Sequence, residues 1–150
     1  MTEDINGNHV VQKILFTFKA PHNQFIFDTM VTKCVAIACH KHGCCVMQKC
    51  IDGASTQQRY NLVNEIISHT GIFVRNPYGN YVVQYVIELN DMAVNAAIGE
   101  QLLGSLLELG KQKYSSNVLE KCLEMNVRRV QDAMVAEMLT APSYLDFLLD

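Results

Sequence analysis

The sequence has no surplus of basic residues. Its 150 residues include 12 lysines and arginines against 15 aspartates and glutamates, so the formal net charge is −3. A protein that holds nucleic acid through its overall charge needs a clear basic excess, because it must neutralise several phosphates at once. Binding by bulk positive charge is therefore excluded, and only a local basic strip is compatible with this composition.

Long apolar runs are also missing. The longest uncharged apolar stretches are of the size of Val35–Cys39, whereas about 20 apolar residues are needed to cross a bilayer. No basic segment followed by an apolar one opens the chain, so nothing supports secretion. Six cysteines without such a signal indicate free thiols in a reducing compartment. We expect a cytoplasmic protein that has no membrane partner.

The familiar signatures of enzymes are absent as well. The sequence contains no G-x-G-x-x-G, G-x-x-x-x-G-K-[ST], G-x-S-x-G or H-E-x-x-H motif. Acidic residues such as Asp28, Glu65 and Glu108 stand singly, as they do on a solvated helix surface. We expect a protein that is not an enzyme and that uses no cofactor and no small-molecule substrate.

Proline is scarce, with three residues, and no alternating apolar and polar run predicts a strand. The segments 24–31, 58–67 and 97–107 instead carry apolar residues at intervals of three and four, which is typical of helices with one buried face. At 49% hydrophobic residues, the chain is also too apolar for a disordered tail. The sequence therefore predicts an all-α fold.

Four segments of the chain align with one another without a gap. They are Gly7–Leu15, Gly43–Ile51, Gly79–Ile87 and Ser115–Leu123, and each begins 36 residues after the one before. We call these segments the motifs. A repeat of this length, with helical segments between the motifs, predicts a solenoid in which each unit buries its apolar side against the next. The expected units are residues 1–34, 35–70, 71–106 and 107–142.

The chain ends on the amphiphilic segment Tyr144–Asp150, which resembles the entry into a further unit. Neither end shows the polar capping helix that solenoids use for solubility. We therefore expect a piece of a longer array.

Each motif combines a polar face with an aliphatic one. On a helix that turns about 100° per residue, Asn8, His9 and Gln12 share one face, and Val10 and Ile14 lie on the other. The three polar-face residues of a motif are called here the first, second and third positions of its triplet. The four triplets are Asn8, His9, Gln12; Cys44, Cys45, Gln48; Asn80, Tyr81, Gln84; and Ser116, Asn117, Glu120.

A ladder of such triplets suits a linear polymer with one subunit per repeat. Asn and Gln can form paired hydrogen bonds with base edges, and Tyr or His can stack on a base. A carboxylate such as that of Glu120 can accept both donors on the Watson–Crick edge of guanine, and the small Cys44 beside Gln48 leaves room for adenine. The alternative without a function is a polar helix face that only contacts solvent. Such a face would not place an amide or a carboxylate at the third position of all four triplets.

The triplets and their flanks resemble the base-reading repeats of the Pumilio (PUF) family. The resemblance rests on strings such as Asn6–Lys13, Asn76–Gln84 and Ser115–Cys122, and it covers nearly the whole chain. It implies a right-handed superhelical crescent of eight repeats, of which this chain resembles repeats four to seven. Single-stranded mRNA would lie antiparallel on the concave face and be read as 5′-GUAU-3′, within the UGUA element of 3′ untranslated regions.

The resemblance also implies a role for each polar position. Base edges would be read by Asn8, Gln12, Cys44, Gln48, Asn80, Gln84, Ser116 and Glu120. Bases would stack on His9 and Tyr81, and more weakly on Cys45 and Asn117. The residue that follows the third position would contact phosphates in three repeats, as Lys13, Lys49 and Lys121, whereas the third repeat has Tyr85 there. Regulation of mRNA stability and translation, with deadenylase or repressor proteins as partners, would follow.

Three other interpretations compete with this one. Cysteine and histidine are crowded between residues 34 and 50, but they form no C-x-x-C pair, and Cys50 falls on a core position of the motif, so we expect no metal site. A peptide-binding scaffold of the armadillo or HEAT type would share the solenoid. A nucleolar relative without sequence specificity would have lost the triplets, which are intact here.

Overall fold

The structure of the chain is a computed structural model that describes residues 5–140, with side chains from residue 7 onward. Within this range the chain forms helices and no strand. The helices are α1 (Ile5–Thr17), α2 (Gln24–Thr32), α3 (Cys34–Ala38), α4 (Gly43–Gly53), α5 (Thr56–Ser68), α6 (Thr70–Phe73), α7 (Gly79–Glu88), α8 (Met92–Leu102), α9 (Leu106–Gly110), α10 (Ser115–Glu124) and α11 (Arg128–Thr140).

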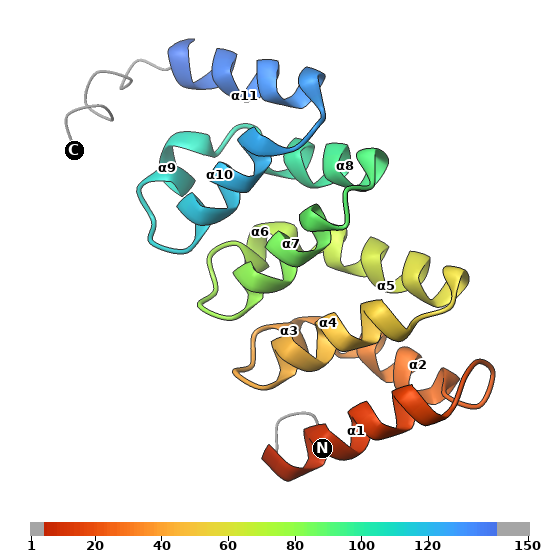
Figure 1. Ribbon diagram of the computed structural model, residues 1–150. Coiled ribbons are helices and arrows are strands. Elements are labelled where there is room, and N and C mark those ends of the chain that lie inside the picture. Colours follow the sequence, from red (N-terminus) through yellow and green to blue (C-terminus); the bar gives the residue numbers. More distant parts are fainter. Residues whose placement is uncertain (1–4, 141–150) are drawn as a thin grey trace.

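The helices form two stacked rows (Figure 1). The motif helices α1, α4, α7 and α10 pack on one another in chain order, and the backing helices α2, α5, α8 and α11 form a second row. The short helices α3, α6 and α9 precede α4, α7 and α10 and pack against them. The predicted all-α solenoid is confirmed, and it consists of two longer helices per unit, joined from one unit to the next by a short connector helix and the loop after it. The expected further repeat at Tyr144–Asp150 lies outside the described residues.

The core lies between the two rows and between consecutive units. Val46, Val82 and Val118, at one register of the motif, are fully buried, because each is covered by the unit before it. The predicted aliphatic face therefore points into the core in α4, α7 and α10. In α1 the prediction is wrong for Val10, which is exposed, because no helix within the described residues covers that side of the first unit.

We call each short helix, α3, α6 or α9, together with the loop after it, a connector. The connector approaches the start of the motif helix so closely that it restricts the first residue of the motif. A Cβ on Gly43 would lie 2.1 Å from the carbonyl oxygen of Ile37, and one on Gly79 would lie 3.0 Å from the Cα of Phe73. In the fourth unit a polar residue occupies the same position. Its motif begins with Ser115, whose hydroxyl donates a hydrogen bond of 2.6 Å to the carbonyl oxygen of Leu109.

In each unit a side chain on the backing helix, or on the residue just before it, donates a hydrogen bond to a backbone carbonyl at the end of the motif helix or just after it. The donors recur every 36 residues, although their residue types differ, and their acceptors are backbone carbonyl oxygens. The donors are Asn23, Arg59, Asn95 and Gln131, and the acceptors belong to Phe18, Ile51, Ile87 and Leu123. These bonds link the two rows and satisfy carbonyl groups that a helix end leaves unpaired. Among the helices described, none is long and apolar enough to span a bilayer.

Candidate nucleic-acid interface

The triplets lie in the first turns of the motif helices, next to the connectors. At the first position Asn8, Cys44 and Asn80 are buried and Ser116 is half-buried. At the second position all four side chains are exposed, and at the third position the glutamines are half-buried and Glu120 is exposed. The second and third positions can therefore reach a ligand directly, whereas the first lies beneath them.

Connector carbonyls hold the first-position side chains in place. The Asn80 amide donates to the carbonyl oxygen of Asn76 at 2.8 Å. The Cys44 thiol points at the carbonyl of Lys41, and the Ser116 hydroxyl donates to that of Lys113 at 3.3 Å. Each of these acceptors lies three or four residues before its donor. The sequence pattern did not indicate these anchors, because carbonyl acceptors carry no residue signature.

In the first and third units the triplet is internally paired. Gln12 Nε2 donates to Asn8 Oδ1 at 3.1 Å, and Gln84 Nε2 donates to Asn80 Oδ1 at 2.9 Å. One amide N–H of each glutamine is used in this way, so its second N–H and its carbonyl oxygen have a fixed direction. Neither Cys44 nor Ser116 has an amide that could orient its partner as Asn80 orients Gln84.

The third connector is itself held by a side chain. Asn76 Oδ1 accepts hydrogen bonds from the backbone N–H groups of Tyr78 and Gly79, both at 2.9 Å. A side-chain oxygen that satisfies free N–H groups at a helix start is a common way to fix that start. Because the backbone carbonyl of Asn76 holds Asn80, one residue positions both the connector and the triplet.

Burial favours the neutral thiol at three cysteines of the 34–50 region. Burial raises the pKa of Cys34 and Cys50 to about 12, and burial together with the neighbouring Cys45 raises that of Cys44 to about 11. Cys44 therefore offers a small, uncharged side chain beside Gln48. Across residues 7–140, no three histidine, cysteine or acidic side chains come close enough to hold a metal ion.

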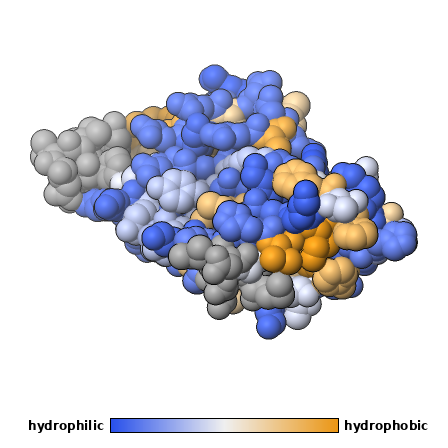
Figure 2. Space-filling model, turned by 60° about the horizontal axis from the view of Figure 1, so that its bottom comes forward, coloured by the Kyte–Doolittle hydropathy of each residue, from blue (hydrophilic) through white to orange (hydrophobic). Residues whose placement is uncertain are grey.

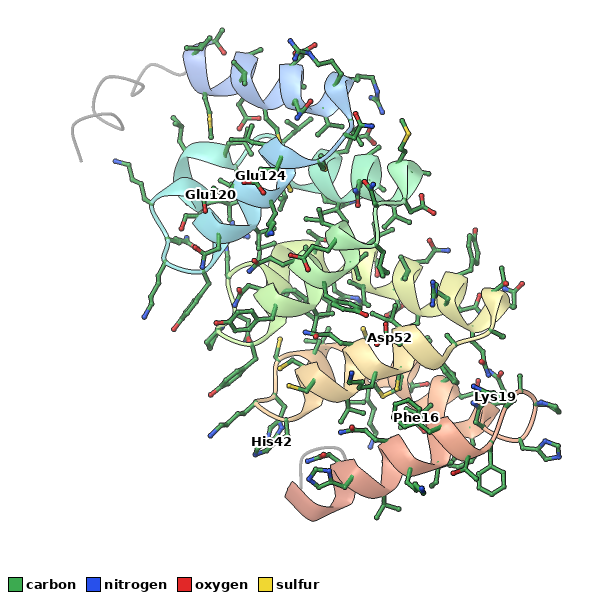
Figure 3. The ribbon with its side chains drawn as sticks, in the orientation of Figure 1. Phe16, Lys19, His42, Asp52, Glu120 and Glu124 are labelled. Carbon is green, nitrogen blue, oxygen red and sulfur yellow. The ribbon has the colours of Figure 1, made fainter. Side chains whose placement is uncertain are left out.

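The residue after the third position has a role that the sequence did not reveal. Lys121 forms an ion pair of 2.9 Å with Glu88, and the Tyr85 hydroxyl donates to the Asp52 carboxylate. Each acidic partner lies 33 residues earlier, on the motif helix of the preceding unit. The residue 33 positions before Lys49 is Phe16, which has no charge (Figure 3). Lys13 and Lys49 are exposed, and their phosphate contact stays a prediction, whereas Lys121 already has a partner in the protein.

Basic side chains outside the motifs border the triplets. Lys41 and Lys113 are exposed in equivalent connectors, 72 residues apart, directly before α4 and α10. The connector before α7 carries Arg75, which pairs with Glu108 at 3.1 Å. His42 follows Lys41 in this connector, and Figure 3 shows it in the loop before α4. Lys41 and Lys113 therefore place local positive charge beside the second and fourth triplets, and their shared register was the signal that could have identified them, whereas the equivalent position in the middle connector is Pro77.

Comparison with known proteins agrees with this geometry. The family model for the Pumilio-family RNA binding repeat matches residues 3–30, 33–67, 73–102 and 105–139. Arabidopsis thaliana pumilio homolog 8 is 42% identical over 144 residues, which are 96% of this chain and 28% of that protein. Saccharomyces cerevisiae Pumilio homology domain family member 4 is 40% identical over 143 residues, which are 93% of this chain and 16% of that protein.

Solved structures of RNA complexes share the fold. The Puf4 RNA binding domain bound to the HO endonuclease RNA 3′ UTR recognition sequence superposes with a TM-score of 0.85 at 37% identity, over 97% of this chain and 46% of that one. The RNA-binding domain of yeast Puf5p bound to MFA2 RNA gives 0.78 at 30% identity, over 93% and 42%. The chain thus spans less than half of these domains and under a third of the two curated relatives. With four consecutive repeats matched in sequence and in structure, the chain belongs to the Pumilio (PUF) family of RNA-binding repeat proteins.

Proposed function

We propose that this chain binds single-stranded RNA sequence-specifically, one base per repeat, through its four triplets. The observation that carries the proposal is the common geometry of the triplets, each with an exposed second position and an amide or carboxylate at the third, and with a first position that a connector carbonyl anchors in the second, third and fourth units. This arrangement offers each base one surface for stacking and one polar edge for pairing.

The finer proposal is that the RNA is read as 5′-GUAU-3′, antiparallel to the chain. Glu120 is exposed, and its carboxylate can accept both donors of guanine, which no other base presents side by side. The paired amides of Asn80–Gln84 and Asn8–Gln12 offer donors and an acceptor in fixed directions, as uracil requires. The neutral, buried Cys44 leaves space above Gln48 for adenine.

Stacking strength differs among the repeats in this proposal. His9 and Tyr81 provide exposed rings, whereas Cys45 and Asn117 provide small side chains. A stacked base contributes about 1–3 kcal/mol, so the first and third repeats supply most of the stacking energy. Four bases then give weak but selective binding, and exposed connector lysines such as Lys41 add a salt-dependent contribution.

The cellular role that fits this binding is post-transcriptional control. The Puf4 domain, to which this chain is similar, is bound to a 3′ UTR recognition sequence. We extend that class of target, mRNA 3′ untranslated regions, to this chain, with control of mRNA stability and translation in the cytoplasm and with deadenylase or repressor proteins as partners. The family consists of RNA-binding proteins rather than enzymes, so the proposed role is binding without catalysis.

The test measures fluorescence anisotropy with a short RNA that contains UGUAU and with the same RNA carrying C in place of G. The wild-type chain is expected to prefer the G-containing RNA by about tenfold or more, since a good base-edge pair is worth about 1–3 kcal/mol. Glu120→Gln should abolish this preference because an amide accepts through one oxygen only.

The matched control is Glu124→Gln, which removes the same charge from the same helix at an exposed position outside the triplet (Figure 3). It should keep the ratio of the two affinities. Equal binding of the two RNAs by the folded wild-type chain, or equal loss in both variants, would overturn base reading at this repeat.

A further inference from the structure

A groove opens between the backing helices α5 and α8, which are neighbours in the second row (Figure 1). It encloses about 680 Å³. Apolar side chains line it from both helices and from the end of the motif helix α7; they are Val63, Ile67, Val86, Leu89, Val94 and Ala97. A cleft of this size, with a mostly apolar lining and a few polar groups, is typical of a binding site.

The groove lies in the middle of the solenoid. Figure 2 shows apolar surface at the end formed by α1 as well, but a repeat that precedes α1 would stack on that surface and cover it. Repeats added before α1 or after α11 would stack on the first or the fourth unit, as consecutive units stack in this chain. Such repeats would leave the space between α5 and α8 open, so the groove is a property of the second and third units.

Small side chains on α8 open the groove. At the junction of the first and second units, Gln58 on α5 donates a hydrogen bond of 3.0 Å to a side chain of the preceding unit. At the junction of the third and fourth units, Arg129 on α11 pairs with Glu100 on α8. The third unit has Val94 at the register of Gln58 and Ala93 at the register of Arg129, and neither side chain can form such a bond. The long polar side chains that bridge the other two junctions are therefore missing here.

The rim of the groove carries one basic and one acidic side chain. Arg59 donates to the carbonyl oxygens of Ile51 and Asp52 at 3.1 and 3.4 Å, so its guanidinium is held at the end of α4 beside an acidic residue. Asp91 is exposed, accepts from the backbone N–H of Ala93 at 2.9 Å and forms no ion pair with a basic side chain among residues 7–140. The unmatched charge at the rim is therefore negative, which disfavours RNA and favours a basic partner.

The walls of the groove favour a helical ligand. Backbone groups of α5 and α8 are paired within each helix, so an extended peptide would lose water from its main chain and gain few partners. A helix pairs its own main chain. On α5 the lining runs from Thr56 to Ile67, which is about 16 Å at 1.5 Å per residue, or three turns. Helices bound in such grooves insert apolar side chains at intervals of three and four.

We propose that the groove binds an amphipathic helix of a partner protein, with bulky apolar side chains on one face and a basic residue beside them. The apolar side chains lie over Val63 and Ile67, and the basic residue pairs with Asp91. The triplet of the third unit begins with Asn80 at the start of α7, whereas Leu89 lines the groove just after the end of that helix. The inference therefore does not depend on base reading, and the partner helix and RNA bind at the same time.

The test selects helical peptides from a display library on the wild-type chain and measures their affinities by fluorescence anisotropy. Selected peptides should carry bulky apolar residues at intervals of three and four, with lysine or arginine beside them. The double variant Ala93→Gln, Ala97→Gln fills the groove with good helix formers, and Gln57 already holds the register of Ala93 in the second unit. It should keep its helical circular dichroism and bind these peptides about tenfold more weakly, because a buried anchor side chain loses its site. Ala136→Gln, at an exposed position of α11, is the control and should bind like the wild type.

Asp91→Asn tests the charge alone. Asn caps a helix as well as Asp does, so α8 should persist while peptide binding weakens by about two- to fivefold, as expected for an exposed ion pair. Asp28→Asn removes the same charge from the backing helix α2 and should have no effect. The proposal would be overturned by a folded wild-type chain that selects no such helix, by peptides that bind the filled variant as tightly as the wild type, or by peptides that the UGUAU RNA displaces.

Discussion

Helices α7 and α10 occupy equivalent places in successive units. They nevertheless differ in residue type at the helix start, in the triplet and at the contact with the preceding unit. The helix α7 begins with Gly79, pairs Asn80 with Gln84 and contacts the preceding unit through Tyr85. The helix α10 begins with a hydroxyl that bonds to the connector and carries a carboxylate without a first-position amide. It contacts the preceding unit through an ion pair.

The comparison distinguishes residues that hold the units together from residues that would contact the proposed RNA ligand. At the start of the motif the connector lies close to the helix. The fold accepts either a glycine there, as in α7, or a serine whose hydroxyl bonds to the connector, as in α10. At the junction between units, a phenol–carboxylate bond and an ammonium–carboxylate pair fill the same place. The third triplet position differs as well, with Gln84 in α7 and Glu120 in α10, and in the proposed function this difference selects the base.

The largest expected effect is on the helix start. Gly79→Val places a branched Cβ against the backbone of Phe73 and should destabilise the fold by about 3 kcal/mol. Ser115→Ala removes only the hydrogen bond to Leu109 and should cost about 1 kcal/mol. Urea denaturation followed by circular dichroism measures both. Equal losses of unfolding free energy in the two variants would contradict the close contact between Gly79 and the backbone of Phe73.

The next effect is on base choice. Ser116→Asn combined with Glu120→Gln gives α10 the paired amides of α7, so its preferred base should change from G to U by about 2 kcal/mol. Anisotropy titrations with RNAs that vary only this base measure the change, and Glu124→Gln is again the control. An unchanged preference for G would contradict the antiparallel assignment of triplets to bases.

A smaller effect is expected at the junction between the second and third units. The hydrogen bond to Asp52, followed by burial, raises the pKa of Tyr85 from 10.0 to about 12. The folded state thus holds this proton more tightly than the unfolded state does, so the stabilisation is complete below pH 10 and is lost between about pH 10 and pH 12. Tyr85→Phe should cost about 1 kcal/mol at neutral pH.

The wild-type chain and Tyr85→Phe should therefore converge in unfolding free energy as the pH rises from 10 to 12. Lysines titrate in the same range, but they do so in both proteins, and the difference isolates the tyrosine. Parallel stability curves across this range would show that the hydroxyl does not bond to Asp52.

The smallest effect is expected at the corresponding junction in α10. The hydrogen bond to Glu88 raises the pKa of Lys121, but both side chains are well exposed to solvent. Exposed ion pairs contribute little and are screened by salt. Lys121→Gln should therefore lower stability less than Tyr85→Phe does, and the difference from wild type should disappear at high salt. A loss that persists at high salt would mean that the lysine acts through packing.

The fold could be predicted in detail from the sequence because the same motif recurs in each unit of the solenoid. Four gapless motifs at an interval of 36 residues fix the unit length, and the aliphatic registers of Val46, Val82 and Val118 identify the buried face. The same registers mispredicted Val10, since burial at a repeat surface depends on the neighbouring unit and not on the residue. The core role of Cys50 followed from its alignment alone.

The site was predictable only in part. The triplet positions and the exposure of their second members follow from helix geometry, as Tyr81 illustrates. The anchoring of Asn80 by a connector carbonyl and the contact of Lys121 with Glu88 join residues whose pairing leaves no short-range pattern. The spacing of 33 residues between junction partners becomes visible only when the units are stacked.

The sequence by itself determined the helical repeat, its period and the identity of the polar side chain at each triplet position, because these are local and periodic properties. The tertiary structure decided which of those side chains are anchored, which are paired and which remain exposed. Those outcomes depend on how close a connector or a neighbouring unit comes to each helix, and that distance is set by the packing of side chains far apart in the chain. The difference between Val10 and Val82 is the clearest case, since one residue type at one register is exposed in the first unit and buried in the third.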